Sequence, residues 1–302
     1  MTVAPPPRPP VQAEPLKAAL WMTGSILGFT VLAISGRQIG TALDPYEIMF
    51  YRSAIGIVTV LAAASLLGTR GEISTRHMHL HILRNLSHFA GQVLWLTALL
   101  LIPLAQLFAM EFSYPIIVAL LAPLFLGERL TQVRMISAAL GFAGILLVAR
   151  PFGGEGLSFG LIAAVGCAFG FAGSAIVTKR LTRVASVTCI LFWLAVIQCL
   201  LGLGFAARDG AVALPPVALI PWVVLIGLSG LVAHLSLTRA LSLAPATVVT
   251  PIDFTRLPLI GVVGMALYGE PLDLWVFLGG AVIFAANWIN LRSEASARTA
   301  IR

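Results

Sequence analysis

Long apolar runs recur along the whole chain, and their length constrains the fold more than any other feature. Ten runs can be separated by turn signals such as Asp44-Pro45, Ile102-Pro103 and Gly269–Pro271. They lie near residues 17–36, 45–67, 81–101, 104–126, 132–149, 157–178, 186–206, 217–241, 245–268 and 272–291. Because a helix needs about 20 apolar residues to cross the hydrocarbon core, the runs predict ten transmembrane helices.

The composition favours the same class of protein. Of the 302 residues, 59% are hydrophobic and 10% are charged, whereas an ordinary soluble domain has about 25% charged residues. The alternative, an unusually apolar soluble helical protein, does not explain why the runs recur at membrane-spanning length. We therefore predict an all-α integral membrane protein with no room for a sizeable soluble domain.

The basic residues sort by side of the predicted membrane. Of the 19 Lys and Arg residues, 14 lie at the chain ends or in the even-numbered loops. Only Arg37, Arg150 and Arg208 fall in the odd-numbered loops, and Arg52 and Arg256 fall inside spans. The positive-inside rule then predicts cytoplasmic termini in a bacterial inner-membrane protein. Since the net charge of +7 is distributed in this way, nucleic acid is not an expected partner.

The chain also matches itself at a single offset of 142 residues. Gly127-Glu128 falls on Gly269-Glu270, and Glu111-Phe112-Ser113 falls on Asp253-Phe254-Thr255. Each copy holds five predicted spans, so the second copy must enter the membrane upside down. Inverted repeats are typical of alternating-access transporters, in which substrate binds near the midplane where the halves meet. The alternative is a duplication kept only for packing, in a channel or an assembly subunit.

The repeat divides the chain into four parts. Residues 1–16 are rich in proline and predict a disordered cytoplasmic tail. Residues 17–149 and 157–291 form the two predicted five-helix repeats, and residues 292–302 form a second cytoplasmic tail.

Two pairs of glycines occupy equivalent positions in the repeats. They are Gly24 and Gly28 in the first span and Gly166 and Gly170 in the sixth. Small residues at this spacing allow helices to approach closely. We expect the first and sixth spans to pack together near the pseudo-two-fold axis.

The fourth and ninth spans share a further pattern. Its residues are Pro103-Leu104-Ala105, Pro115 and Leu126-Gly127-Glu128 in the first copy, and Leu243-Ala244-Pro245-Ala246 and Gly269-Glu270 in the second. This pattern resembles the EamA-type repeat of the drug/metabolite transporter superfamily. The resemblance implies ten helices around a central cavity, and movement of metabolites across the bacterial inner membrane. The segment Asp253-Phe254-Thr255-Arg256-Leu257-Pro258 further resembles the branch that includes S-adenosylmethionine uptake and riboflavin transporters.

Four ionisable side chains stand out within the predicted spans, namely Glu111, Asp253, Arg256 and Arg52. Each is a candidate site residue, because such a group costs roughly 2.5–3.5 kcal/mol on insertion scales. Glu111 and Asp253 are repeat-equivalent and could bind an amine-bearing substrate or take up a proton, since burial disfavours a charged carboxylate. Arg256 could bind a carboxylate or phosphate, or could simply neutralise Asp253 on the same helix face. For Arg52, structural pairing or snorkelling is favoured.

A second group of candidates is aromatic or polar, comprising Trp95, Gln92, His88, Tyr114, Phe254 and His234. Trp95, Gln92 and His88 share one face of the third span, and Trp95 could stack on a planar substrate. His234 is a second candidate proton carrier. The alternatives are packing or lipid contact for the rings and a satisfied core position for His234.

A third group is structural or gating. Pro115, Pro251 and Pro258 are predicted to interrupt the fourth and ninth spans, and such breaks often line cavities; tolerated kinks are the alternative. Glu128 and Glu270 follow glycines that end these spans and are predicted to lie near the surface.

These patterns predict a secondary transporter with a midplane cavity formed mainly by spans one, three, four, six, eight and nine. We expect a small polar or amphipathic substrate, similar to S-adenosylmethionine, a flavin or an amino acid. Its gradient, exchange or protons would drive transport by a monomer or homodimer in the bilayer. No phosphate-binding loop or nucleophile–base pair occurs in the sequence, so neither an enzyme nor a cofactor or metal is expected. An exporter of amino acids or toxic metabolites, or a non-transporting membrane protein, remains the alternative.

Overall fold

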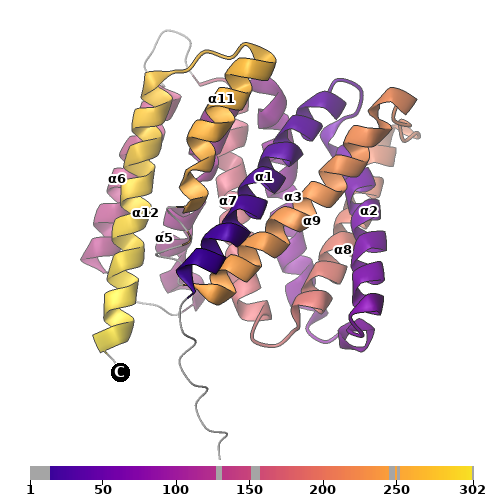
Figure 1. The fold of residues 1–302 in the computed structure, drawn as a ribbon, viewed down its shortest axis with the longest axis horizontal. Coiled ribbons are helices and arrows are strands. Elements are labelled where there is room, and N and C mark those ends of the chain that lie inside the picture. Colours follow the sequence, from indigo (N-terminus) through magenta and orange to yellow (C-terminus); the bar gives the residue numbers. More distant parts are fainter. Residues whose placement is uncertain (1–13, 127–130, 151–156, 245–248, 250–251, 301–302) are drawn as a thin grey trace, which may run out of the picture.

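The computed structural model describes residues 14–126, 131–150, 157–244, 249 and 252–300, which form helices and no strand. The α-helices are α1 (Pro15–Ile39), α2 (Pro45–Leu66), α3 (Met78–Leu101), α4 (Leu104–Glu111), α5 (Tyr114–Leu126), α6 (Gln132–Ala149), α7 (Phe159–Leu181), α8 (Val187–Ala206), α9 (Ile220–Leu243), α11 (Arg256–Tyr268) and α12 (Leu274–Ala300). Short 3₁₀ turns lie at Arg70–Glu72, Ala207–Asp209 and Val217–Leu219. Figure 1 shows that α1 begins and α12 ends at the same face of the molecule. We call this the terminal face, and the other end the opposite face.

Eight helical segments are long and apolar enough to cross a membrane. They are Leu16–Ile39, Pro45–Leu66, Leu104–Leu121, Gln132–Ala149, Phe159–Leu181, Val187–Ala206, Val217–Leu241 and Leu274–Ser293. The helix α3 has the length, but its histidine, asparagine and glutamine side chains lower its mean hydropathy. The helix α11 has only 13 residues. The all-helical, multi-pass class is confirmed, and the number of ten spans stays a prediction.

Helix ends follow capping signals in the sequence. The Asp44 side chain accepts a hydrogen bond from the Glu47 N–H, and the Glu47 side chain accepts one from the Asp44 N–H. Ser186 caps α8 with one bond of the same kind. Gly269 ends α11 in the left-handed conformation, with φ of 64°. Gly127, its counterpart, lies outside the described residues.

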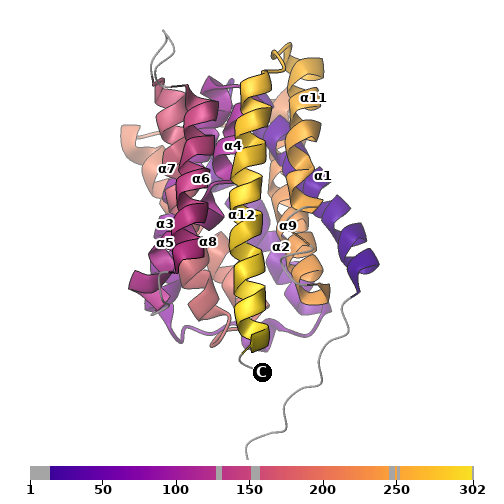
Figure 2. The same cartoon turned by 90° about the vertical axis from the view of Figure 1, so that its left-hand side faces the viewer.

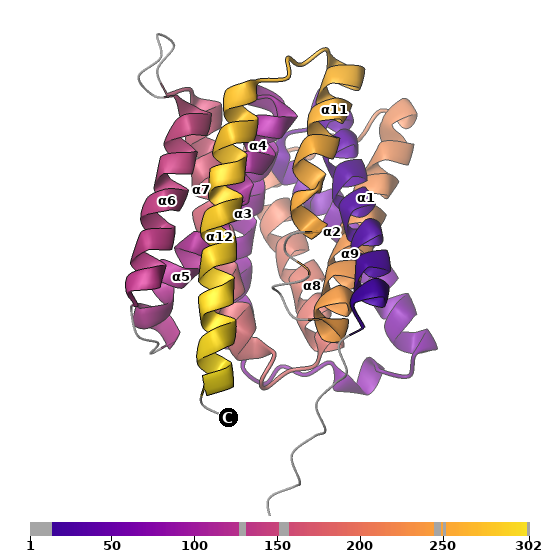
Figure 3. The same cartoon turned by 60° about the vertical axis from the view of Figure 1, so that its left-hand side comes forward.

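The most extensive helix contacts each join one helix of the first repeat to one of the second. The pairs are α1 with α9, α3 with α7, α2 with α8 and α6 with α12. Figures 2 and 3 show α12 beside α6 along one side of the molecule and α1 near α9 on the other. The two repeats are therefore interleaved along their whole length.

Glycines allow the closest of these approaches. A Cβ added to Gly170 would lie 2.5 Å from the Gly91 Cα in α3, and one added to Gly28 would lie 3.0 Å from the Ala233 Cα in α9. The expectation that the first and sixth spans pack on each other through their glycines is wrong. Because the repeats are interleaved, the glycine face of each helix packs on a helix of the other repeat. The residues met are Ser236 for Gly24, Ala233 for Gly28, Leu94 for Gly166 and Gly91 for Gly170.

The predicted fourth span is broken near its midpoint. The helix α4 ends at Glu111 and α5 begins at Tyr114. Pro115 lies in the first turn of α5, where its missing N–H costs no intrahelical hydrogen bond. The break places the carboxylate of Glu111 at a helix end inside the protein.

The ninth predicted span is broken at the equivalent position. The helix α11 begins at Arg256, directly after a turn at Thr255 and a short helical stretch at residues 252–254. Pro258 lies in the first turn of α11, just after this break, as Pro115 lies in the first turn of α5. Pro251 lies outside the described residues.

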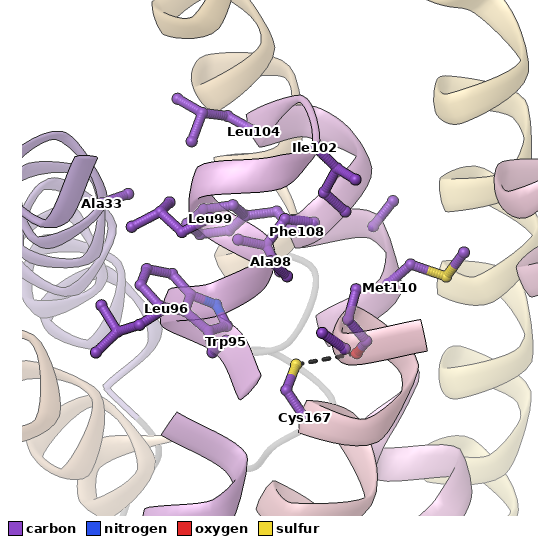
Figure 4. Close-up of a cluster of buried hydrophobic side chains, with 14 of the residues drawn as sticks. Ala33, Trp95, Leu96, Ala98, Leu99, Ile102, Leu104, Phe108, Met110 and Cys167 are labelled. Atoms are coloured by element: carbon purple, nitrogen blue, oxygen red, sulfur yellow. Dashed lines mark hydrogen bonds between the residues drawn. The ribbon is translucent and has the colours of Figure 1, made fainter. Parts of the chain in front are cut away.

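A buried apolar cluster fills the half of the molecule toward the opposite face. Figure 4 shows Leu99, Ile102, Leu104 and Phe108 gathered around the end of α3 and the start of α4, with Trp95 at the lower edge. These five side chains are at most 5% exposed.

Candidate functional site

A cavity of about 420 Å³ lies between the two repeats, within the range of about 300–1,000 Å³ usual for small-molecule sites. It is lined by the six spans from which the sequence predicts a cavity. The lining residues are Phe29, Leu32, Arg84, His88, Gln92, Trp95, Glu111, Tyr114, Phe171, Ser174, Ala175, Thr178, Lys179, Thr182, His234, Leu237, Asp253 and Arg256.

A charged cluster lies where the two helix breaks meet. Arg256 Nη2 is 3.5 Å from Glu111 Oε1 and 3.5 Å from Asp253 Oδ2. The indole N–H of Trp95 donates to Glu111 Oε2 at 2.7 Å. One guanidinium thus faces a carboxylate from each repeat, and it neutralises Asp253 as the simpler alternative predicted.

Arg256 is also surrounded by aromatic rings, and only 3% of it is exposed. Its guanidinium carbon lies 4.4 Å from the ring centroid of Phe29 and 5.0 Å from those of Phe108 and Phe112. Arg256 Nε and Nη1 and Asp253 Oδ1 have no hydrogen-bond partner among the described residues. An unmet buried donor or acceptor costs about 1–3 kcal/mol, so these atoms are available to bond to a substrate or water.

One face of α3 supplies a polar wall. Arg84, His88, Gln92 and Trp95 follow one another at helical spacing, and all four line the cavity. Arg52 of α2 donates a hydrogen bond to Gln92 Oε1 and so fixes the orientation of the Gln92 side chain. His88 is buried, and its Nε2 finds no hydrogen-bond partner in the described part of the chain.

Four rings form a second wall, which we call the aromatic wall. The ring centroids of Phe29 and His234 are 5.2 Å apart, those of His234 and His88 are 6.4 Å apart, and those of His88 and Phe171 are 5.7 Å apart. These separations fall within the usual range of aromatic pairs. The rings come from α1, α9, α3 and α7. Their successive planes are inclined by 87°, 64° and 42°, so a planar substrate would stack on one ring and meet the edges of its neighbours.

The cavity reaches the terminal face of the molecule. Its lining extends to Lys179 and Thr182 at the end of α7, where both residues are exposed at the terminal face. In the other direction the lining stops at Trp95, Glu111 and Leu32, beneath the buried apolar cluster.

Near the opposite face lies a hydrogen-bonded group that we call the Arg37–Glu270 latch. Arg37 bonds to the carboxylate of Glu270, and it also donates to the carbonyls of Leu99 at 2.9 Å and Ile102 at 2.7 Å. Glu270 accepts from the N–H of Leu104 at 2.8 Å. The latch ties the first repeat to the second above the apolar cluster.

Comparison with known proteins identifies the family. A model of the EamA-like transporter family matches residues 16–150 and again residues 158–292. The chain belongs to the EamA-like transporter family. A riboflavin transporter of Brucella anthropi is 29% identical over 86% of this chain and 93% of its own length. An S-adenosylmethionine uptake transporter of Rickettsia bellii is 25% identical over 92% of this chain and 94% of its own length.

The EamA-like fold is also found in a solved crystal structure. That protein superposes with a TM-score of 0.63 at 20% identity, over 90% of this chain and 96% of its own. The family match confirms the resemblance carried by the repeated Pro and Gly-Glu positions. The family and the relatives named above are transporters rather than enzymes.

Most predicted site residues of this EamA-like chain lie on the cavity, and their contact with substrate stays a prediction. They are Glu111, Asp253, Arg256, Trp95, Tyr114, Gln92, His88 and His234. Phe254 is not among the lining residues. Its ring packs on Phe112 and Phe284 at 4.7 Å each, so packing, the alternative role, describes it better. Glu270 belongs to the latch, and Glu128 lies outside the described residues.

Other residues of the site were not predicted. Arg37 and Arg84 enter the sequence argument only as orientation charges, yet one forms the latch and the other lines the cavity. Two signals could have found them: Arg84 precedes His88 by one helical turn, and Arg37 falls on Lys179 at the repeat offset. The rings of Phe29 and Phe171 had no such signal, because apolar helices carry aromatic residues on every face.

Proposed function

We propose that this chain is a secondary transporter that moves a planar, flavin-like metabolite across the bacterial inner membrane by alternating access. One observation carries the proposal: a cavity at the junction of the repeats reaches one face, and the latch and the apolar cluster lie toward the other. Within it, the aromatic wall lies near a cluster of opposite charges. A substrate that bonded to both Glu111 and Arg256 would link the two repeats, which must move relative to each other during transport.

The proposal includes ten membrane spans. In addition to the eight apolar segments, α3 would cross because its polar side chains Arg84, His88 and Gln92 face the cavity rather than lipid. The ninth span would contain α11. An even number agrees with the position of both helical ends at the terminal face (Figure 1). The positive-inside count assigns that face to the cytoplasm, so the cavity would be open inward.

Charge and shape favour a flavin over S-adenosylmethionine. Riboflavin has a planar three-ring system that suits the aromatic wall, whereas S-adenosylmethionine carries sulfonium and ammonium cations. Arg256 already pairs with both acidic lining residues, Glu111 and Asp253, and Arg84 is a further buried cation of the lining. Both arginines disfavour a cationic substrate.

Binding to the purified protein in detergent tests the proposal. We expect riboflavin to lose fluorescence on stacking and to raise the melting temperature, as any ligand of the folded state does. S-adenosylmethionine and free amino acids should do neither. Riboflavin uptake by cells that require it, compared with efflux from preloaded cells, then gives the direction of transport.

A pair of variants adds a matched control. Phe171→Leu removes a ring of the aromatic wall and should weaken riboflavin binding. Phe169→Leu removes a ring from the outer side of the same helix, where the side chain is exposed, and should leave binding unchanged. Absence of any riboflavin signal with well-folded protein would overturn the flavin assignment.

A further inference from the structure

Arg84 is a buried cation to which the described part of the chain supplies no carboxylate. It lies in the second turn of α3, lines the cavity and is 8% exposed. Its Nε donates to Thr178 Oγ1 at 3.2 Å and its Nη1 to Asn85 Oδ1 at 3.3 Å. Among the described residues, no carboxylate oxygen lies within 4.0 Å of it. Since a guanidinium has five N–H donors, most of its bonding capacity is unused.

The contrast with Arg256 shows why this matters. Arg256 lies in the same cavity, but two carboxylates and three rings surround it. A buried charge that lacks a partner is strongly destabilising, and within a membrane span it marks a ligand site by default. A ligand that brings negative charge to Arg84 would remove this cost.

The neighbours of Arg84 have the chemistry to hold an anion. One turn along α3, the buried Nε2 of His88 has no hydrogen-bond partner among the residues described. Across the cavity, Ser174, Thr178 and Thr182 follow at four-residue spacing along α7, so their hydroxyls lie on one wall. Lys179 lines the same end.

We infer that Arg84 is the centre of an anion-binding subsite for a carboxylate or phosphate at the end of the substrate. The inference rests on the proposed function, because the ring of the same substrate would lie on the aromatic wall, to which His88 also belongs. An arginine suits this role since its planar fork can make two parallel charged hydrogen bonds to either group. The favoured substrate is therefore a planar heteroaromatic compound with an anionic tail.

Three flavins with the same ring system test the subsite. Riboflavin has a neutral hydroxyl tail, flavin mononucleotide ends in phosphate, and a flavin with a carboxymethyl group on N10 ends in carboxylate. We expect at least one anionic flavin to bind about tenfold or more tightly than riboflavin, by fluorescence titration of the purified protein. The anionic flavin that binds more tightly shows whether the subsite prefers phosphate or carboxylate.

Charge variants then assign the preference to one residue. Arg84→Gln should abolish the preference, because it should weaken binding of the anionic flavin about tenfold more than binding of riboflavin, and Arg84→Lys should restore part of the preference. Arg76→Gln removes one exposed charge from the loop before α3 and should preserve the preference. If Arg84→Gln is poorly folded, Arg84→Lys, which keeps the charge but loses the fork, should still reduce the preference.

The outcomes separate the two proposals. Equal affinity for all three flavins, or equal weakening of all three by Arg84→Gln, would overturn the subsite and leave flavin transport standing. If none of the three flavins binds the folded wild-type protein, the proposed function and the subsite both fall.

Discussion

The two faces of the protein carry equivalent charged residues in the sequence, and the structure describes their contact at the opposite face. At the opposite face, Arg37 at the end of α1 bonds to Glu270, which follows α11. At the repeat offset of 142, Arg37 corresponds to Lys179 at the end of α7, and Glu270 corresponds to Glu128. Lys179 lines the cavity where it reaches the terminal face, and Glu128 lies outside the described residues.

An inverted repeat can therefore place the same kinds of charged residue at both faces from one duplicated sequence. If the protein works by the proposed alternating access, the latch opens when the end of the cavity near Lys179 closes. Two such states of one protein typically differ by a few kcal/mol. Residues that differ between the repeats then determine which state is favoured. One such difference is that the first repeat has Arg37 where the second has Lys179.

The largest effect on transport is expected from the charged cluster at the centre of the protein, which belongs to neither face. Glu111→Gln removes the carboxylate that faces Arg256 and accepts from Trp95. Because this contact belongs to the centre, its loss should affect both states, and we expect transport to fall about tenfold or more. Uptake by proteoliposomes measures it. Undisturbed transport would remove Glu111 from the mechanism.

A matched control uses the other acidic residue of the cluster. Asp253→Asn leaves the pair of Glu111 and Arg256 in place, and it should reduce transport less than Glu111→Gln does. Equal melting temperatures of the two variants would show that the difference is not one of folding.

The next largest effect is expected from breaking the latch. Glu270→Gln weakens the bond to Arg37 and should favour the state open at the opposite face. A loss of about 1.4 kcal/mol shifts the balance of states tenfold. A cysteine at Ala98, which is fully buried near the apolar cluster, reports the shift if Cys167, Cys189 and Cys199 are first replaced by alanine.

The readout is the rate of labelling by an impermeant thiol reagent from the periplasmic side. We expect the Ala98→Cys site to react about tenfold faster with Glu270→Gln than without it. Glu47→Gln alters an acidic side chain that accepts a bond from Ala213 N–H away from the latch and should not change the rate. If Glu270→Gln labelled as slowly as the Glu47→Gln control, the latch would not hold the opposite face closed.

The sequence predicts most of the architecture because membrane burial and duplication both leave clear patterns. Apolar runs give the helices, and the offset of 142 predicts that Glu111 and Asp253 occupy equivalent positions within their spans. The pairing of helices was not predictable in this way. A Gly-x-x-x-Gly pattern shows that a helix packs closely but not on which partner, and Gly28 and Gly170 each pack on the other repeat.

The site is only partly readable from the sequence for a related reason. Buried charge marks Glu111 and Arg256 because the membrane makes it costly, whereas Arg84 lies close enough to a span end to look like an orientation charge. Burial of Arg84 depends on how α3 packs against α7, which a single sequence does not report. Phe254 is the opposite case. The sequence predicts it as a candidate site residue, but its ring packs on Phe112 and is not among the lining residues of the cavity.

A smaller effect is expected when the two faces are made more alike. Arg37→Lys places a lysine in the latch, which is the residue type that the second repeat has at the equivalent position, Lys179. A lysine ammonium is a point charge that cannot reproduce the fork by which Arg37 bonds to Glu270 and to the carbonyls of Leu99 and Ile102. We expect labelling at Ala98→Cys to rise severalfold, but less than with Glu270→Gln.

The reciprocal change tests whether the comparison holds in both directions. Lys179→Arg should favour closure of the terminal face, and so it should also raise labelling at Ala98→Cys. An effect of opposite sign would show that Lys179 does not act as the counterpart of Arg37.

The smallest effect on transport is expected at the glycine contacts, which should change stability instead. Gly170→Ala would place a Cβ 2.5 Å from the Gly91 Cα, whereas at Gly28 the nearest atom would be the Ala233 Cβ at 2.9 Å. Overpacking costs about 1–3 kcal/mol, so Gly170→Ala should lower the melting temperature by several degrees and Gly28→Ala by less. Gly204→Ala has nothing within 4 Å and serves as the control. If Gly170→Ala were no worse than this control, α3 and α7 would not be in tight contact, and the interface would be free to move during transport.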